Sequence, residues 1–227
     1  MRVAIVGGTG DEGFGLALRL AAAGVQVTIG SRASERAEEA ATRVRGTLGD
    51  HVPIDGAENA AAVTTADLVF VTVPYAGQAD TYRSLKEHWP DGVIVCDTTT
   101  PLASAVGGRA TQVLRPWHGS AAEQARPLLP KGTRLVSGFH SVGAHPLTDH
   151  PNPVDADALL CGDDADAKAA VGSMVELIPG MRWVDCGPLE MARILEPLTA
   201  ALIRVNVRYG VKGAGIRFAG RDAWGAE

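Results

Sequence analysis

The stretch MRVAIVGGTGDEGFGLALRLAAAGVQVTIGSRASER, residues 1–36, decides the fold. An apolar run over residues 2–6 is followed by a glycine-rich turn, an amphipathic run over 14–23 and a β-branched run over 25–29. These runs predict a strand, a turn, a helix and a second strand. Elements in that order form the unit that binds a dinucleotide.

The glycine turn has the G-x-G-x-x-G spacing of a dinucleotide-binding turn, at Gly8, Gly10 and Gly13. We expect Gly8 to permit the tight turn and Gly10 to let the pyrophosphate approach the backbone. Gly13 should let the helix lie close to the strand. The free amides at the start of the helix would then face the phosphates.

The end of the second strand favours NADP over NAD. An NAD site usually has an acid there, which accepts a hydrogen bond from the ribose 2′-hydroxyl. This chain has Ser31 and Arg32 instead, and Arg36 follows Arg32 at the i, i+4 spacing of one helical face. A hydroxyl and guanidinium groups suit a 2′-phosphate. The alternative is that Ser31 or Ser34 caps the next helix while the arginines are solvated.

Length, composition and charge describe an ordinary α/β protein. The chain has 227 residues, of which 46% are hydrophobic, and can bury a core. The formal net charge of −5 gives no reason to expect a nucleic-acid partner. No apolar run approaches a membrane span, and a strand beginning at Arg2 leaves no room for a signal peptide. Three widely spaced cysteines stand in no ligand or redox motif, so we expect a reducing, cytoplasmic location.

The rest of the chain predicts a Rossmann-like, doubly wound, mostly parallel sheet. Further strands are expected at 52–54, 68–73, 93–96, 134–137, 158–161 and 183–186, and helices at 34–45, with Ser34 as N-cap, 77–88 and 165–177. Alternating strands and helices imply right-handed crossovers. Ligands of such sheets sit outside the carboxyl ends of the strands. The turns that follow Val6, Ile29, Val73, Cys96 and Phe139 should therefore share one edge.

Three segments depart from this pattern. Residues 143–157 hold three prolines and two histidines and are long enough to be a lid. Apolar residues spaced along 191–205 mark a helix that Pro197 should kink or divide. Residues 210–220 and the polar end should be partly loose. We therefore divide the chain into a dinucleotide-binding domain, residues 1–186, and a C-terminal helical extension, residues 187–227, that completes the cleft.

No strong acid–base or metal constellation stands out. The spacing of His140, His145 and His150 matches no common ligand motif, so we expect no metal. His140 alone follows a predicted strand on the ligand edge, where it could orient a ring or be a structural histidine. The Tyr-x-x-x-Lys pair of tyrosine-assisted carbonyl reduction is absent. Hydride transfer between two bound cofactors depends on ring alignment more than on a strong acid or base, and it suits such a chain.

The order of the motifs resembles one family, the NADPH-dependent coenzyme F420 reductases. The likeness runs from Met1 to about Phe218. It rests on these stretches: Gly7-Gly8-Thr9-Gly10, Gly30-Ser31-Arg32, Val73-Pro74, Cys161-Gly162-Asp163-Asp164, Gly187-Pro188-Leu189, Leu198-Thr199 and Gly213-x-Gly215-Ile216. The resemblance implies reversible hydride exchange between NADP(H) and the 5-deazaflavin coenzyme F420, in a homodimer built through the C-terminal helix.

The resemblance also implies site residues. The pyrophosphate would meet Thr9, Gly10, Asp11 and Glu12, and the 2′-phosphate would meet Ser31, Arg32 and Arg36. The nicotinamide side would be lined by Val73, Pro74, Gly77, Thr99 and Ala144, and the deazaflavin would lie at or near His140, Arg193 and Thr199. The carboxylates of Asp11 and Glu12 stand where the family often has neutral residues, and we expect both to point outward.

The sequence thus predicts an NADP-dependent oxidoreductase of the F420:NADP type, acting on small-molecule cofactors. One alternative is an NADPH-dependent reductase of a flavin, an imine or a small carbonyl compound on the same fold. Another is a non-catalytic NADP(H) sensor that reports redox state to a partner.

Overall fold

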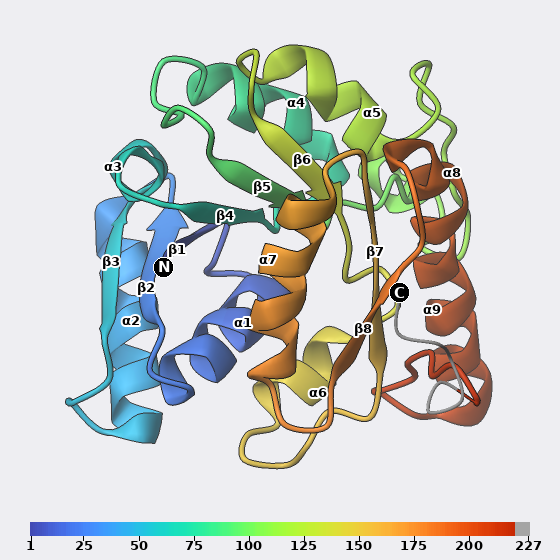
Figure 1. Cartoon of the computed structure of the whole chain (residues 1–227). Helices are drawn as coiled ribbons and strands as arrows, with labels where there is room; N and C mark the ends of the chain where they lie inside the picture. Colours follow the sequence, from blue (N-terminus) through green and yellow to red (C-terminus); the bar gives the residue numbers. More distant parts are fainter. Residues whose placement is uncertain (221–227) are drawn as a thin grey trace.

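Eight strands form one sheet in the order β3-β2-β1-β4-β5-β6-β7-β8 (Figure 1). The structure is a computed structural model that describes residues 1–220. The strands are β1 Arg2–Val6, β2 Gln26–Ser31, β3 Ile54–Glu58, β4 Leu68–Val71, β5 Ile94–Asp97, β6 Arg134–Ser137, β7 Asp157–Gly162 and β8 Arg182–Asp185. All neighbours are parallel except β6 and β7, so the predicted mostly parallel, Rossmann-like sheet is confirmed.

The antiparallel strand β7 extends the sheet beyond the edge where ligands are expected. Its last two residues pair with the end of β6, Cys161 with Ser137 and Gly162 with Val136. The beginning of β7 therefore lies past the carboxyl ends of the parallel strands, and β8 runs beside it. Strands β7 and β8 therefore extend the sheet past the carboxyl end of β6.

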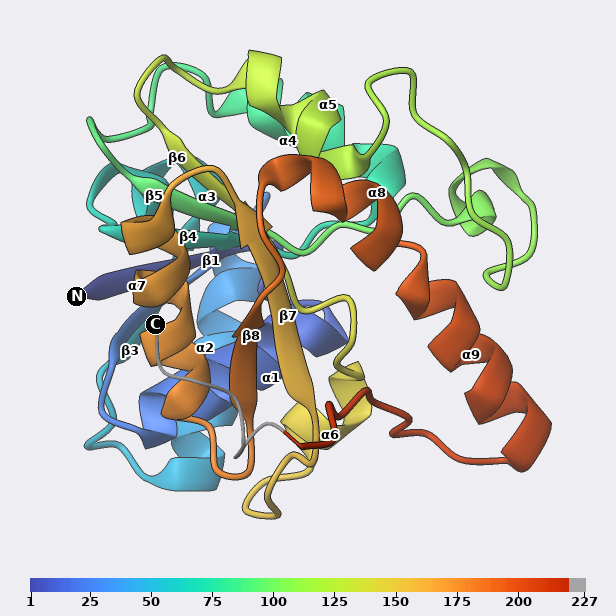
Figure 2. The same ribbon diagram turned by 45° about the vertical axis from the view of Figure 1, so that its right-hand side comes forward.

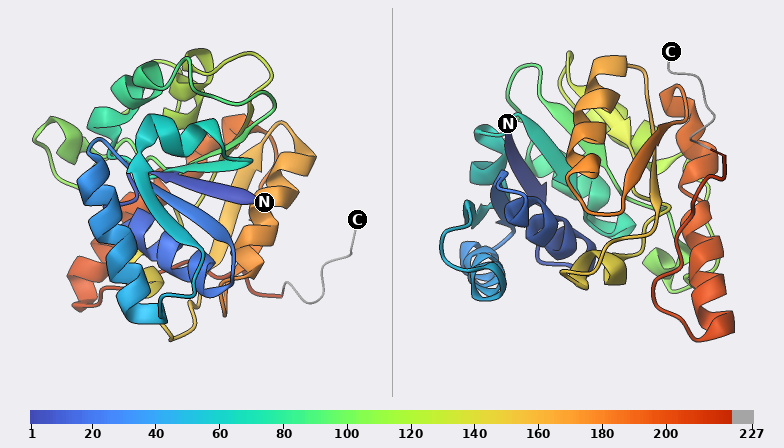
Figure 3. Two further views of the ribbon diagram at one scale, coloured as in Figure 1. Left: turned by 90° about the vertical axis from the view of Figure 1, so that its left-hand side faces the viewer. Right: turned by 60° about the horizontal axis from the view of Figure 1, so that its bottom comes forward.

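Helices cover both faces of the sheet (Figure 3). They are α1 Asp11–Ala22, α2 Ser34–Leu48, α3 Asn59–Thr64, α4 Tyr75–Ser84, α5 Ala121–Ala125, α6 Ala144–Thr148, α7 Ala165–Glu176, α8 Ala192–Leu195 and α9 Leu198–Tyr209. Alternate residues of β1 face opposite cores. Ile5 belongs to a core cluster that includes residues of α1, α2, α6 and α7, whereas Val6 belongs to one that includes residues of α3, α4, α5 and α8. No helix within residues 1–220 has the length and apolar composition that a membrane crossing needs.

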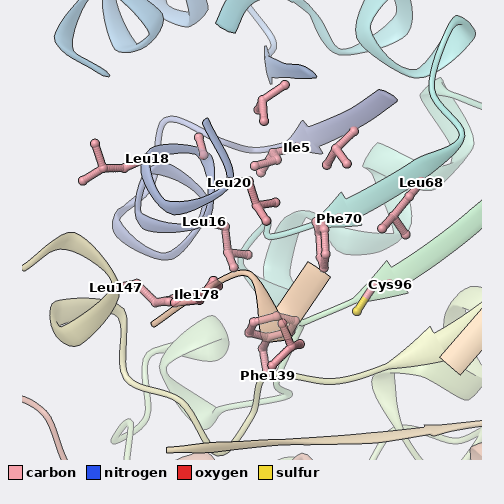
Figure 4. Packing of buried hydrophobic residues seen from close by; sticks show 14 of the residues in the cluster. Ile5, Leu16, Leu18, Leu20, Leu68, Phe70, Cys96, Phe139, Leu147 and Ile178 are labelled. Carbon is pink, nitrogen blue, oxygen red and sulfur yellow. The ribbon is translucent and has the colours of Figure 1, made fainter. Parts of the chain in front are cut away.

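The segment 143–157 is not the lid that its composition suggested. It contains α6, which packs on α1 with Leu147 fully buried (Figure 4). The buried Arg19 of α1 donates from Nε to the Leu147 carbonyl at 2.9 Å and from Nη2 to the carbonyls of Pro146 and Asp149 at 2.8 and 3.1 Å. A Cβ at Gly15 would lie 2.6 Å from the Cβ of Leu147, so glycine is required at this contact. The lid prediction is wrong because an arginine fixes the backbone of the segment.

Residues 213–218 are also fixed rather than loose. The Asp157 amide donates to the Ile216 carbonyl at 2.7 Å, and the Ile216 amide donates to the Ser141 carbonyl at 3.2 Å. The Arg217 guanidinium lies 3.2 Å from an oxygen of Asp157, which has no exposed surface. The chain end therefore returns to the start of β7. The polar end that was predicted to be loose, residues 221–227, lies outside the described residues.

Pro197 divides the C-terminal helix, as predicted, into α8 and α9. Pro197 takes the N-cap position of α9, where its missing amide costs no hydrogen bond. Figure 2 shows α9 standing away from the sheet, attached at both ends. Ser34, in contrast, is not the N-cap of α2: the helix begins at Ser34, and Ala33 precedes it without a side-chain cap.

Candidate active site at the carboxyl edge of the sheet

The glycine turn connects β1 to α1 in a conformation that only glycines allow. The positive φ of +77° falls on Gly7, not on Gly8. The Gly8 amide donates to the Gly30 carbonyl at 3.0 Å, and a Cβ on Gly8 would lie 2.8 Å from the Ile5 carbonyl oxygen. Gly8 is therefore needed for close packing between β1 and β2, while Gly7 makes the turn.

The other two glycines suit the roles predicted for them. A Cβ at Gly13 would lie 2.4 Å from Thr72 Oγ1 and 2.7 Å from Gly8 Cα, so only glycine lets α1 approach the sheet. At Gly10 the nearest atom to such a Cβ would be the Gly7 carbonyl oxygen, at 3.6 Å, and the space beside it is open. Phe14 is the first amide of α1 that bonds back into the turn, to Gly10. The amides of residues 11–13 remain available to an anion.

Glu12 does not point outward as predicted. Its carboxyl turns toward the end of β5, where it meets the Thr98 side chain and the charge of Asp97. Burial raises the pKa of Glu12 to about 8, and the bond from Thr98 offsets this only in part. Asp11, beside the exposed Gly10, is exposed. The glycine turn therefore carries a half-buried carboxyl whose pKa lies above that of an exposed glutamate.

The end of β2 presents two uncommitted arginines. Ser31 is buried, and its Oγ accepts from the Ala33 amide at 3.4 Å, which leaves the hydroxyl hydrogen available. Arg32 and Arg36 are exposed and form no ion pair with any of residues 1–220. Their exposure at the carboxyl end of β2 suits the predicted 2′-phosphate site.

The predicted nicotinamide side gathers at the ends of β4 and β5. Thr99 is buried, and its Oγ1 donates to the Val73 carbonyl at 3.4 Å. A Cβ on Gly7 would lie 2.7 Å from Val73 Cγ1, so the glycine turn touches Val73. Pro74 is the N-cap of α4, whose first turn contains Gly77. Ala144 begins α6, which packs on α1 rather than on these residues.

A buried carboxyl network beneath this edge was not predicted. Asp97 has no exposed surface and accepts from Gln78 Nε2 at 2.8 Å, from the Tyr82 hydroxyl at 2.7 Å and from the Thr99 amide at 2.7 Å. Burial raises the pKa of Asp97. The sequence carried one signal of this network, an aspartate at position 97 directly after the apolar run of residues 93–96. The network fixes the backbone at Thr99.

Of the three residues predicted on the deazaflavin side, the structure brings His140 and Thr199 together. His140 is buried, with Nε2 2.9 Å from Ser137 Oγ and Nδ1 3.2 Å from Thr100 Oγ1. Burial lowers the pKa of His140 to about 3, so the ring is neutral. Thr199 Oγ1 donates to the His140 carbonyl at 2.9 Å. The preceding Phe139 has a φ of +69°, a strained value for a non-glycine residue, and packs edge-on to Phe70 with centroids 5.6 Å apart (Figure 4).

Arg193 lies elsewhere, on α8. Its Nε and Nη2 donate to the two oxygens of Glu123, at 2.8 and 2.6 Å. It borders a pocket of about 480 Å³ with Arg115 and Glu196 and with residues of the loop 101–119. The structure thus groups Arg193 with this loop, and Thr199 with His140.

Glu196 joins the C-terminal helices to the body of the molecule. Its carboxyl is 1% exposed and accepts from the amides of Ala121 and Ala122, at 2.8 and 3.0 Å, at the start of α5. Burial raises its pKa to about 8. Sequence reasoning missed this residue, because its partners lie about 75 positions away. Within residues 1–220 no three His, Cys, Asp or Glu side chains are grouped as a metal site requires.

Known proteins share this sequence and fold. Residues 2–101 match the family described as NADP oxidoreductase, coenzyme F420-dependent. The chain is 43% identical over 219 residues to the F420-dependent NADP reductase of Methanothermobacter thermautotrophicus, covering 96% of this chain and 94% of the relative. It is 44% identical over 220 residues to the F420-dependent NADP reductase of Methanocaldococcus jannaschii, covering 96% and 97%.

A crystal structure assigned as an F420-dependent NADP reductase from Arthrobacter sp. FB24 superposes with a TM-score of 0.74 at 26% identity, covering 96% of this chain and 99% of that one. The likeness therefore extends through the glycine turn, the sheet and the C-terminal helices. The protein belongs to the family of F420-dependent NADP reductases.

Proposed function

We propose that the protein transfers a hydride between NADP(H) and the deazaflavin coenzyme F420. The observation that carries this proposal is the pair of exposed, uncommitted arginines at the end of β2, Arg32 and Arg36, beside a glycine turn with free amides. The relatives are named for the same two cofactors, and this supports F420 as the molecule that exchanges the hydride with NADP(H).

The NADP half of the site is proposed as follows. The amides that follow Gly10 bind the pyrophosphate, and Thr9, Asp11 and Glu12 surround it. Ser31 donates a hydrogen bond to the 2′-phosphate, and Arg32 and Arg36 supply its counter-charge. The nicotinamide side is formed by Val73, Pro74, Gly77, Thr99 and Ala144.

The residues on the deazaflavin side act by placing the ring. When both cofactors are bound, the nicotinamide and the deazaflavin would supply the two carbons between which the hydride moves. His140 is neutral, and both of its nitrogens already have partners, so it holds the backbone and Thr199 in place and exchanges no proton. Arg193 offers positive charge at the pocket beside the loop 101–119. Catalysis on this scheme comes from alignment of two rings rather than from an acid or a base.

A homodimer built through α9 is part of the proposal. Val205, Val207 and Tyr209 on α9, and Val211 just beyond it, are exposed apolar side chains. In the described part of the chain, Ala200 is the one residue of α9 that is buried. A helix that stands away from its own sheet and exposes apolar side chains suits burial against a second copy (Figure 2). We propose that residues 187–227 form the C-terminal extension that carries this interface. We also propose that the protein is cytoplasmic and has no nucleic-acid partner.

Anaerobic mixing of the protein with NADPH and F420, followed by deazaflavin absorbance, tests the function. FMN is mixed in parallel. Turnover of F420 but not FMN supports the proposal. Turnover of FMN alone indicates a flavin reductase, and NADPH binding without turnover indicates a sensor.

A further inference from the structure

Four side chains of the candidate site are joined end to end by hydrogen bonds. Ser137 meets one nitrogen of His140, Thr100 meets the other, and the hydroxyls of Thr100 and Thr199 lie 3.0 Å apart. Thr199 then returns to the backbone of His140. Each of the three contacts between side chains is compatible with two directions of donation, but the contact with the His140 carbonyl leaves only one direction for all three.

The direction is fixed at Thr199. Its Oγ1 lies 2.9 Å from the His140 carbonyl oxygen, which can only accept. A threonine hydroxyl has a single hydrogen, and this contact uses it. In the contact between the two threonines, Thr100 must therefore be the donor and Thr199 the acceptor.

The same reasoning fixes the histidine. Thr100 has already used its hydrogen on Thr199, so the 3.2 Å contact with Nδ1 requires the hydrogen to be on Nδ1 of His140. The buried ring is neutral and carries one hydrogen, which leaves Nε2 to accept from Ser137 at 2.9 Å. The chain thus runs one way, from Ser137 through His140 and Thr100 to Thr199.

This direction determines what Thr199 can offer a ligand. Its hydrogen is committed and one lone pair accepts from Thr100, so the second lone pair remains. Thr199 is half-buried at the start of α9. Pro101, which follows Thr100, and Pro197, two residues before Thr199, both line the pocket of about 480 Å³.

We propose that Thr100 is a positioning residue that sets this direction, and that Thr199 consequently accepts a hydrogen bond from a ring N–H of the deazaflavin. The ligand half of this inference rests on the proposed function. The pyrimidinedione edge of a deazaflavin carries an N–H donor between two carbonyl acceptors. A ligand that offered only a carbonyl oxygen at this point would face the Thr199 lone pair and be disfavoured.

Nitrogen NMR of protein labelled with ¹⁵N-histidine, without any cofactor, tests the direction of the chain. Loss of signals in His140→Asn assigns the ring. We expect Nδ1 to have the shift of a protonated nitrogen and Nε2 that of an unprotonated one. Thr100→Val removes the acceptor of Nδ1–H and should move the hydrogen to Nε2, where Ser137 Oγ can accept it. Ser137→Ala should leave it on Nδ1. A hydrogen on Nε2 in the wild type, or no change in Thr100→Val, overturns the assignment.

Kinetics test the ligand half. Thr100→Val should raise the KM for F420 about tenfold, because a hydroxyl freed from Thr100 can turn away from its present direction. The NADPH affinity should stay unchanged, and Thr100→Ser should restore the KM. Thr64→Val is the matched control, since it removes a hydroxyl that donates to the Ala60 carbonyl on the distant helix α3.

The outcomes separate the two proposals. An unchanged KM for F420 in a Thr100→Val protein whose histidine hydrogen has moved overturns the role of Thr199. Absence of F420 turnover in the wild type instead overturns the proposed function and the ligand half with it, and the NMR result still decides the role of Thr100. The wild-type spectrum decides the direction even if Thr100→Val does not fold.

Discussion

Both oxygens of the Glu123 carboxylate accept from the guanidinium of Arg193, at 2.8 and 2.6 Å. The same carboxylate accepts from the hydroxyl of Ser120, the N-cap of α5, so α5 and α8 are joined through it. This bidentate contact keeps the Arg193 guanidinium in one orientation at the edge of the pocket. Arg193 thus has a structural partner in addition to any coenzyme that it contacts.

Arg193→Ala should raise the apparent KM for F420 and slow hydride transfer. The NADPH affinity should stay within about threefold, under ~0.7 kcal/mol. Glu123→Gln is the control, because it weakens the ion pair and keeps the charge of Arg193. Steady-state kinetics and thermal melting are measured for both. Equal losses of F420 kinetics in the two variants, or a loss that follows the melting temperature, would assign Arg193 to structure alone.

Arg32→Ala should weaken NADPH binding far more than NADH binding. The variant loses a charge-assisted contact with the 2′-phosphate, worth roughly 1.5–3 kcal/mol, or about ten- to a hundredfold in affinity. Titration calorimetry with both nucleotides measures the difference. Arg134→Ala is the control, since Arg134 donates to the Gly92 carbonyl at the start of β6, away from the ligand edge. Equal weakening of both nucleotides would make Arg32 a structural residue.

Gly10→Val should abolish nucleotide binding without unfolding the chain. Gly10 has the extended angles φ −79° and ψ 163°, and a Cβ there would have its nearest neighbour at 3.6 Å, so a branched side chain fits the protein but blocks the pyrophosphate. Gly13→Ala offers the contrast, because its Cβ would meet Thr72 Oγ1 at 2.4 Å and lower the melting temperature. Normal NADPH binding by Gly10→Val would show that the glycine turn connects β1 to α1 but does not bind the pyrophosphate.

Glu12 should make the folded state less stable as pH rises from 5 to 8. Its carboxyl keeps a proton up to about pH 8 in the folded chain, whereas an exposed glutamate loses it near pH 4.3. Between these values the folded state binds more protons than the unfolded state, so the free energy of unfolding falls with rising pH. Glu12→Gln cannot ionise.

The difference in melting temperature between Glu12→Gln and the wild type should therefore grow from pH 5 to pH 8 and then level off. Each kcal/mol lost from the free energy of unfolding of the wild type should add roughly 2–4 °C to this difference. Glu196, whose pKa is raised in the same direction, is present in both proteins and cancels in the difference. Glu39→Gln, an exposed change on α2, is the control. A difference that does not vary with pH would show that Glu12 is ionised in the folded chain.

Val207→Glu should dissociate the proposed dimer. Val207 is 66% exposed on α9, where a carboxylate would be buried against the second copy. Sedimentation velocity measures the mass of the wild type and the variant. Leu177→Glu, at the exposed end of α7, is the matched control. A wild type that sediments as a monomer, or a variant that remains a dimer, would contradict an interface on α9.

The sequence predicted those features that have local signals. The glycine spacing, the apolar strands and the break at Pro197 each depend on neighbouring residues, and the structure has them. The prediction that Gly8 makes the tight turn was wrong, because Gly7 has the positive φ. The spacing of the glycines does not say which of them takes that conformation. The inward turn of Glu12 was missed because it depends on Thr98 and Asp97, which the fold brings to it from far along the chain.

Other features could not be predicted because their partners are distant or belong to the backbone. Arg19 fixes residues 146–149 through three carbonyl oxygens, and a carbonyl is present at every position. The antiparallel direction of β7 likewise follows from where the segment after β6 is fixed, since β7 begins beyond the edge of the sheet. Polar contacts across long separations in sequence leave no periodic pattern.

The attachment of α9 at both ends limits how the proposed cleft can change shape. Glu196 and Thr199 fix its start to α5 and to His140, and after its last turn residues 214–216 return to Asn206 and to Ser141. A helix attached at one end can rotate about that end as about a hinge. A helix attached at both ends can rotate only about the line that joins its two attachment points. The spacing between the two hydride-exchanging rings would then be set when the chain folds, not when the coenzymes arrive.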